Sequence, residues 1–245
     1  EFMTNLEVVN ASLWTRGNNH YVDIFGVLSG SGTLTATANA AGAGRIHSRW
    51  RSANTFNGTL IIDNVYLDIE NANAFQNANV VINYDDGFQI DESVVSGQTI
   101  NIRALSGTGL LDFQANNFVT TSDVNTTFAG TLQSTGTNSQ IRNFTKAGTG
   151  ILTLAGQVTN FGRLYNTGGG EVEILQGGTW QRIETNGGTV DIRDGATVNL
   201  ANDGPDVFIV TGGAGAFVRD GADVTLTSNA TSPLPRVLQT GGVFN

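Results

Sequence analysis

Cysteine is absent from the 245-residue sequence, and lysine occurs once, as Lys146. Without cysteine the chain can form neither a disulfide framework nor a thiolate metal site. The absence also suits a chain exported unfolded through a narrow pore, where a disulfide-closed loop would be too wide to pass. Charged residues of either sign make up only 13% of the sequence, against ~25% in an average globular protein. The surface must therefore be built largely from asparagine, threonine, serine and glutamine.

Basic residues are outnumbered by acidic ones. Twelve lysine and arginine residues stand against 21 acidic residues, which gives a formal net charge of -9. Binding to nucleic acid or to an anionic membrane surface needs a basic stripe or patch, so the sequence disfavours both partners. No stretch approaches the ~20 apolar residues of a transmembrane helix, and we expect no membrane insertion.

Glycine is abundant, at 32 of 245 residues, about twice the usual share of roughly 7%. Hydrophobic residues make up 39% of the chain, enough for a sizeable core. Apolar and polar residues alternate with period two in residues 65–70 and 190–193, as in half-buried strands. No helical stripe is sustained over three turns, and residues 70–78 predict a loop or single turn. We therefore predict a nearly all-β chain.

Two long blocks of sequence repeat. Leu-Ser-Gly-Ser-Gly-Thr-Leu at 28–34 leads to Phe-Asn-Gly-Thr-Leu at 56–60, and Leu-Ser-Gly-Thr-Gly-Leu at 105–110 leads to Phe-Ala-Gly-Thr-Leu at 128–132. A third block opens at 146–151 and then decays. Such repetition favours a solenoid, in which each repeat packs on the next, over the sandwich and barrel that short strands also allow.

The repeat shortens beyond residue 165, where glycine pairs precede short apolar segments. Residues 193–198 and 219–224 match almost letter for letter, 26 positions apart. We interpret the glycine pairs as corners that need positive φ, because neither a phosphate-loop motif nor a βαβ context accompanies them. The pairs are 169–170, 187–188, 212–213 and 241–242.

Three stretches resemble the autotransporter-associated β-strand repeat, also called the passenger-associated transport repeat. Lys-Ala-Gly-Thr-Gly-Ile-Leu-Thr-Leu-Ala-Gly at 146–156 is similar to its core, and the segments at 56–60 and 128–132 are similar to its F-x-G-T-L element. Asn-Ala-Asn-Ala-Phe at 71–75 resembles the segment that follows, with Gln76 where the family commonly has glycine. The likeness covers residues 25–160 and continues beyond them only in rhythm.

This resemblance implies a right-handed parallel β-helix within a secreted passenger, carried across the outer membrane of a Gram-negative bacterium by a C-terminal barrel. The chain carries neither that barrel nor a signal peptide, so this export route is inferred for a parent protein. We interpret residues 1–3 as a cloning scar and residues 4–245 as a single elongated β-helical passenger fragment. Its recognisable repeats span about 25–160 and its less regular rungs span 161–245.

Candidate catalytic and metal-binding residues are sparse. His20 and His47 are the only histidines and lie in no metal-binding spacing, so no metal or cofactor is expected. Four acidic residues gather at 85, 86, 91 and 92, but they lack the alternating spacing of a calcium loop, and Gly87 indicates a turn.

The most unusual local stretch is Gly-Arg-Ile-His-Ser-Arg-Trp-Arg at 44–51, which interrupts the first repeat. It concentrates arginine, histidine and tryptophan in an acidic chain, and an inserted loop of that composition is typical of an interface hot spot. In the alternative, the arginines alternate outward while Ile46 and Trp50 pack inward. The predicted partner-binding residues are Arg45, His47, Arg49, Trp50 and Arg51.

Together these observations predict a non-enzymatic, secreted or cell-surface passenger region that acts as a rigid stalk. Its loops would contact a host-cell receptor or a surface glycan, and the chain would be monomeric. Two alternatives stay open because fold does not fix function. One is a β-helical polysaccharide-processing enzyme or a phage tailspike-like glycan binder, which would need a groove with carboxylates and an arginine on adjacent rungs. The other is a self-associating surface or filament subunit.

Overall fold

The computed structural model describes residues 5–15, 21–38, 47–90, 97–114, 116–135, 142–202, 206–228, 236–239 and 243–245. Within these ranges the chain is all-β, with strands and turns but no helix. Every strand pairing in them is parallel. The all-β prediction is confirmed, and no helix long and apolar enough to cross a membrane occurs in the described residues.

The first of two eleven-stranded sheets, sheet 1, runs along the whole molecule, and its strands follow one another in chain order. Its strands are β2 (Asn10–Thr15), β5 (Thr33–Ala38), β7 (Thr59–Asp63), β9 (Asn79–Ile82), β12 (Ala104–Gly107), β15 (Thr126–Phe128), β18 (Ile151–Leu154), β20 (Glu171–Ile174), β22 (Thr189–Ile192), β25 (Gly215–Val218) and β28 (Val243–Phe244).

The other long sheet, sheet 2, begins later in the chain and branches at β21, which pairs with β23 and with β24, and β24 in turn pairs with β27. A further pairing joins β13 to β16, and β16 to β19. Its strands are β11 (Thr99–Ile102), β13 (Leu111–Asp112), β14 (Asn117–Thr120), β16 (Leu132–Gln133), β17 (Asn143–Lys146), β19 (Gln157–Asn166), β21 (Gly177–Asn186), β23 (Thr197–Asn202), β24 (Asp206–Thr211), β26 (Asp223–Ser228) and β27 (Arg236–Gln239).

Two smaller sheets complete the N-terminal rungs. Sheet 3 orders β10 (Phe88–Ile90), β8 (Tyr66–Ile69), β6 (His47–Trp50) and β3 (Tyr21–Ile24). Sheet 4 pairs β1 (Leu6–Glu7) with β4 (Leu28–Ser29). The expected turn near residues 70–78 is present, since residues 72–77 form turns between β8 and β9.

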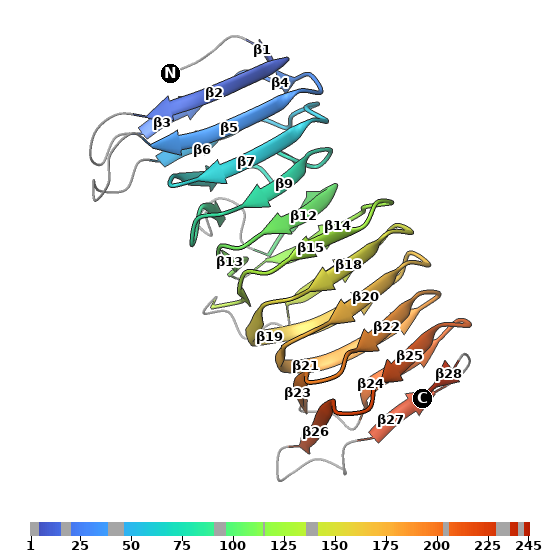
Figure 1. Ribbon diagram of the computed structural model, residues 1–245. Coiled ribbons are helices and arrows are strands. Elements are labelled where there is room, and N and C mark those ends of the chain that lie inside the picture. Colours follow the sequence, from blue (N-terminus) through green and yellow to red (C-terminus); the bar gives the residue numbers. More distant parts are fainter. Residues whose placement is uncertain are drawn as a thin grey trace.

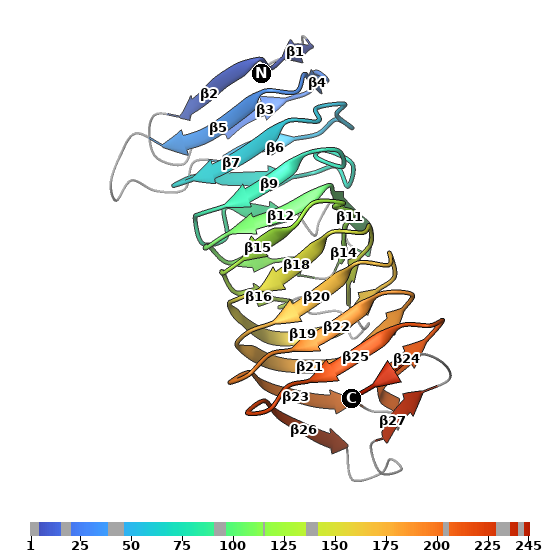
Figure 2. The ribbon, with the colours of Figure 1, turned by 45° about the vertical axis from the view of Figure 1, so that its right-hand side comes forward.

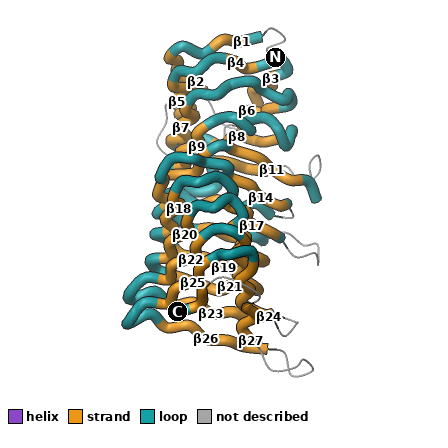
Figure 3. Tube along the Cα trace, turned by 90° about the vertical axis from the view of Figure 1, so that its right-hand side faces the viewer, coloured by secondary structure: helices purple, strands orange, loops and turns teal. Residues whose placement is uncertain are grey.

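The strands stack along an elongated body, from β2 at one end to β28 at the other (Figures 1 and 2). From the side, the strands form columns that loops join (Figure 3). Stacked parallel strands with short connections are consistent with the predicted solenoid.

The interior of this stack changes character near Gly150. Residues 47–150, which we call the aromatic half, bury a chain of neighbouring rings: Trp50 and Phe75 lie 4.9 Å apart between ring centroids, and Phe118 stacks on Phe144 at 5.8 Å with an interplanar angle of 9°. Residues 151–228, the charged half, bury mainly aliphatic side chains such as Leu164. The two halves therefore share a backbone plan but fill it differently.

A column of buried polar side chains lies at the C-terminal ends of four sheet 2 strands, β14, β17, β19 and β21. Thr120, Lys146, Asn166 and Thr185 are successive Cα partners, and each is at most 1% exposed. The Lys146 Nζ donates a hydrogen bond to the Gly148 carbonyl at 2.6 Å, and the Asn166 and Thr185 side chains donate to carbonyls of the turns that follow them. Each side chain thus adds a hydrogen bond to a corner carbonyl, and the Gly170 and Gly188 carbonyls also accept a backbone amide of the next rung.

The glycine of the F-x-G-T-L element serves close rung packing. A Cβ on Gly130 would lie 1.7 Å from the Gly109 carbonyl oxygen, and a Cβ on Gly156 would lie 1.9 Å from the Gly130 carbonyl oxygen. No side chain fits at such separations, so these corners stack backbone on backbone. Neither glycine has a positive φ, so the motif requires glycine here for space and not for backbone conformation.

Candidate functional site

The segment predicted to bind a partner lies mostly in a strand, not in an inserted loop. Arg45 lies outside the described residues. His47 begins β6, which pairs with β3 and β8, but its side chain is likewise not described. Of the two interpretations of this segment, an interface loop and an alternating segment, the alternating one describes residues 47–50, and the neighbouring strands of sheet 3 settle the pairing.

Trp50 points into the core and the two arginines beside it face acidic side chains. Trp50 is 1% exposed and packs against Phe75. Arg49 lies 3.5 Å from Asp23 and 3.6 Å from Glu70, and Arg51 lies 3.6 Å and 2.8 Å from the same two carboxylates. This is the alternating arrangement, with charges balanced two against two. Partner binding stays a prediction here, and Trp50 offers almost no surface for it.

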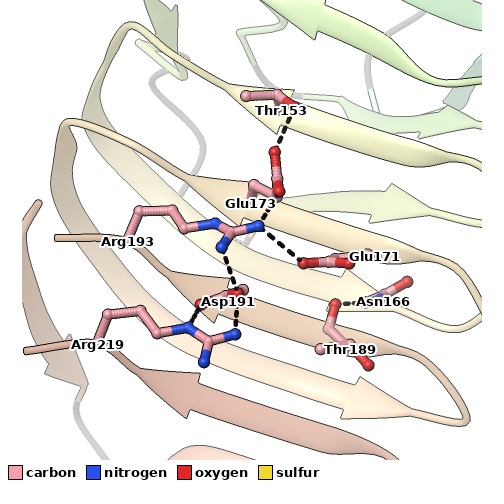
Figure 4. A network of polar contacts seen from close by, with 8 residues as sticks. All are labelled: Thr153, Asn166, Glu171, Glu173, Thr189, Asp191, Arg193 and Arg219. Atoms are coloured by element: carbon pink, nitrogen blue, oxygen red, sulfur yellow. Dashed lines mark hydrogen bonds and ion pairs between the residues drawn. The ribbon is translucent and has the colours of Figure 1, made fainter.

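A second cluster of charges, not predicted from the sequence, lies on sheet 1 in the charged half (Figure 4). Thr153, Glu173 and Asp191 are successive Cα partners on β18, β20 and β22, so their side chains share one face of the sheet. Glu173 and Asp191 are like charges directly opposite each other, which is unfavourable without compensation. We call the cluster of Glu171, Glu173, Asp191, Arg193 and Arg219 the charge network.

Two arginines compensate these carboxylates. Arg219 binds Asp191 in a bidentate manner, with Nε–Oδ1 and Nη2–Oδ2 distances of 2.8 and 2.6 Å. Arg193 bonds to Glu173 and lies 3.2 Å from Asp191 and 3.6 Å from Glu171. Asp191 is itself only 1% exposed, and it is paired with both guanidinium groups, as a buried carboxylate requires.

Burial is the main cause that raises the pKa of Glu171, and the neighbouring charges of Glu173 and Asp191 raise it further. Arg193 and Arg219 counteract part of this shift. Glu173 also accepts a hydrogen bond from the Thr153 hydroxyl at 2.8 Å. The carboxylate oxygens of the network therefore contact other groups of the protein, and these contacts link successive rungs.

Surface hollows near the network differ from a catalytic groove. One, of about 440 Å³, is lined by Gln157, Leu175, Gln176 and other residues outside the network. Another, also about 440 Å³, includes Arg219 but none of the three carboxylates. Glycosidases need a pair of carboxylates on either side of the bond to be cleaved, and neither hollow supplies one.

The acidic residues 85 and 86 form a turn, as Gly87 indicated. Asp85 Oδ1 accepts a hydrogen bond from the Leu110 amide at 3.0 Å, and Asp86 adopts a φ of 57°. Residues 91 and 92 lie outside the described residues. In the described part of the chain, no group of three or more histidine, aspartate or glutamate side chains is arranged to hold a metal ion.

One sequence signal does point to the charge network. The matching segments 193–198 and 219–224 stack directly, since Thr197 pairs with Asp223 and Val198 with Val224. Their first residues are the two arginines that bind Asp191. In comparisons with known proteins, no family model, no curated protein and no solved structure matches this chain.

Proposed function

We propose that the chain is a non-enzymatic stalk segment of a secreted or cell-surface passenger protein, built as a right-handed parallel β-helix. The observation that carries the proposal is the unbroken order of sheet 1, in which each strand between β2 and β28 pairs with the strands of the preceding and following rungs. A rung added to such a stack finds its backbone partners already in place. Folding outside the cell would then proceed by the addition of one rung after another, and each added rung would draw more of the chain outward.

The charge network supports a structural role. Its arginines join carboxylates of successive rungs, and Asp191 has almost no exposed surface with which to meet a substrate. The resemblance to autotransporter repeats supplies the export route and the Gram-negative surface location. Contact with a host-cell receptor or a surface glycan would be made by the exposed faces and loops of the rod.

Export can be tested by placing residues 4–245 between a signal peptide and the outer-membrane barrel of an autotransporter in a Gram-negative host. We expect the chain to reach the surface of intact cells, where added protease degrades it. Gly130→Val, which blocks rung stacking, should reduce the amount displayed. Full display of that variant would show that stacking does not drive export, and an experimental density map would settle the hand of the helix.

A second candidate is a polysaccharide-processing enzyme or glycan binder, favoured by the carboxylates and arginines of the charge network on adjacent rungs. An enzyme of this kind would release reducing or unsaturated sugars from a polysaccharide, and Glu171→Gln, at the most exposed carboxylate of the network, would abolish the release. The third candidate, a self-associating subunit, predicts a particle mass by light scattering that grows with protein concentration. A monomer mass that does not change with concentration, together with no sugar release, would contradict both alternatives and favour the stalk.

A further inference from the structure

A compact grid of polar side chains covers the outer face of three adjacent sheet 2 strands. Asn143 and Thr145 on β17 are the Cα partners of Arg163 and Tyr165 on β19, which in turn pair with Arg182 and Glu184 on β21. All six are half-buried. They alternate with Phe144, Leu164 and Ile183, which are fully buried beneath them. We call these six residues the arginine grid.

The arginine grid places two like charges directly opposite each other. Arg163 and Arg182 are Cα partners, an arrangement that destabilises a sheet unless something compensates it. Among the described residues, the one ion pair that either arginine makes joins Arg182 to Glu184 at 3.6 Å, and Glu184 is the one carboxylate in the grid. By contrast, Arg49 and Arg51 share two carboxylates.

Several hydrogen-bonding groups of the grid have no partner within the described part of the chain. The Nε atoms of Arg163 and Arg182 and the Oδ1 atom of Asn143 are buried and unpaired. Arg142 adds another guanidinium to these rungs: its carbonyl accepts the Arg163 amide at 2.7 Å, its residue is 5% exposed, and its Nε and Nη2 atoms are buried and unpaired. Buried groups of this kind call for a partner such as water, an ion or a ligand.

Tyr165 lies between the two guanidinium groups. Its hydroxyl oxygen accepts hydrogen bonds from Arg163 Nη1 at 3.4 Å and from Arg182 Nη2 at 3.3 Å. Because the oxygen acts as acceptor twice, its own proton remains available to donate outward. The half-buried ring offers an apolar flank beside a polar tip. Two guanidinium groups, a phenol donor and an amide are therefore gathered within three rungs.

We propose that the arginine grid binds an acidic sugar unit within an otherwise neutral oligosaccharide. The guanidinium groups and the Tyr165 hydroxyl would hold the carboxylate, and Asn143 and Thr145 would bond to sugar hydroxyls. Arginine suits this role because its planar fork matches a carboxylate. A long polyanion is disfavoured by the net charge of -9, whereas a single anionic group meets a local positive site.

The inference builds on the surface-contact part of the proposed function, but it is independent of the export route. It also moves the expected contact from loops to a strand face. A rod that is displayed on cells but does not bind the acidic sugar would therefore contradict only the binding proposal. A rod that binds the sugar but is not displayed would contradict only the export route.

Titration with sialyllactose and with lactose, its neutral parent, at fixed ionic strength tests the proposal, and two-dimensional amide NMR follows the binding. We expect sialyllactose to shift resonances of β17, β19 and β21, lactose to bind much more weakly, and added salt to weaken the binding. Sodium acetate and sodium sulfate at equal concentration distinguish a sugar site from a site for any small anion. Equal response to lactose, or to the free anions, would overturn the proposal.

Variants then locate the site. Arg163→Gln and Arg182→Gln should each weaken sialyllactose binding by at least about tenfold, since each removes charge-assisted hydrogen bonds. Tyr165→Phe should weaken it less and leave the sheet intact. Arg103→Gln removes an equal charge from an exposed residue outside the grid and serves as the matched control. An equal loss of affinity in Arg103→Gln and Arg163→Gln would show that net charge, and not the grid, determines binding.

Discussion

The aromatic half and the charged half use the same parallel rungs but join them by different means. In the aromatic half, rings from successive rungs touch inside the stack, as Phe88, Phe118 and Phe144 do. In the charged half, the interior is mostly aliphatic, and arginines join carboxylates across rungs on the outer face. Arg49 and Arg51 also join carboxylates across rungs in the aromatic half, so the difference lies in the interior, which is aromatic in one half and mostly aliphatic in the other. The two halves should therefore respond differently to core mutation, and Lys146 and Glu171 should give them different responses to pH.

The largest expected effect comes from Gly130→Val in the aromatic half. Because even a Cβ at this position would lie 1.7 Å from the Gly109 carbonyl oxygen, the valine must separate two rungs. We expect a loss of more than ~5 kcal/mol in the free energy of unfolding, or a failure to fold. Urea unfolding followed by circular dichroism measures it.

Gly187→Ala in the charged half is the matched control. No heavy atom lies within 4 Å of the position of its Cβ, but its φ is 86°. The cost should be about 1–2 kcal/mol, from the left-handed backbone alone. Equal losses for the two variants would contradict the distinction between a glycine needed for space and one needed for φ.

Phe118→Ala should produce the next largest effect. The ring contacts Phe88, Phe113 and Phe144, and its removal leaves a cavity in the middle of the aromatic interior. We expect a loss of about 3–5 kcal/mol. Hydrogen exchange should accelerate in rungs near residues 80–146 and remain unchanged near residues 189–218. Uniform acceleration along the whole chain would instead indicate one cooperative unit.

Lys146 should give the aromatic half an alkaline pH dependence. Burial lowers the pKa of Lys146, although Asp123 offsets part of the shift, so the folded state holds this proton less tightly than the unfolded state. The free energy of unfolding should therefore rise with pH between the lowered pKa and that of a free lysine.

The measurement is the difference in stability between the wild-type protein and Lys146→Met across this pH range, with the single lysine Cε resonance followed by NMR. A resonance that titrates with a pKa equal to or above that of a free lysine would contradict the prediction.

Glu171 should give the charged half the opposite and smallest dependence. Its pKa is raised by burial and by Glu173 and Asp191, so the folded state holds this proton more tightly than the unfolded state. Stability should fall as pH rises from the pKa of a free glutamate through the raised value, and Glu171→Gln should lack this slope. Identical pH profiles of the two proteins in chemical denaturation would remove Glu171 as the cause.

Much of the fold could be predicted from the sequence because it follows from local periodicity. Alternating residues predicted strands at 65–70 and 190–193, and the structure has β8 (Tyr66–Ile69) and β22 (Thr189–Ile192) there. Repeated blocks indicated stacking: Leu34 and Leu60 of the first block are Cα partners on β5 and β7. At His47–Trp50 the sequence left two interpretations open, an interface loop and an alternating segment, because the choice depends on sheet 3 partners 19 or more residues away.

The polar sites could not be read from the sequence in the same way. Arg163 and Arg182 are 19 residues apart and Asn143 lies 20 residues before Arg163, yet all three are neighbours across a sheet. Rung lengths vary, so no fixed period aligns these residues. Only where two rungs share one sequence, as at Arg193 and Arg219, does the spacing reveal the stacking.

The buried position of Lys146 makes the chain an internal reporter of its own folding. As the only lysine, it carries the only side-chain amine, and it is 1% exposed. Reagents that modify amines should therefore react with the folded protein mainly at its terminus and gain a second site when the corner at Gly148 opens. The rate of that second modification would measure how often this rung detaches from its neighbours, without any added label.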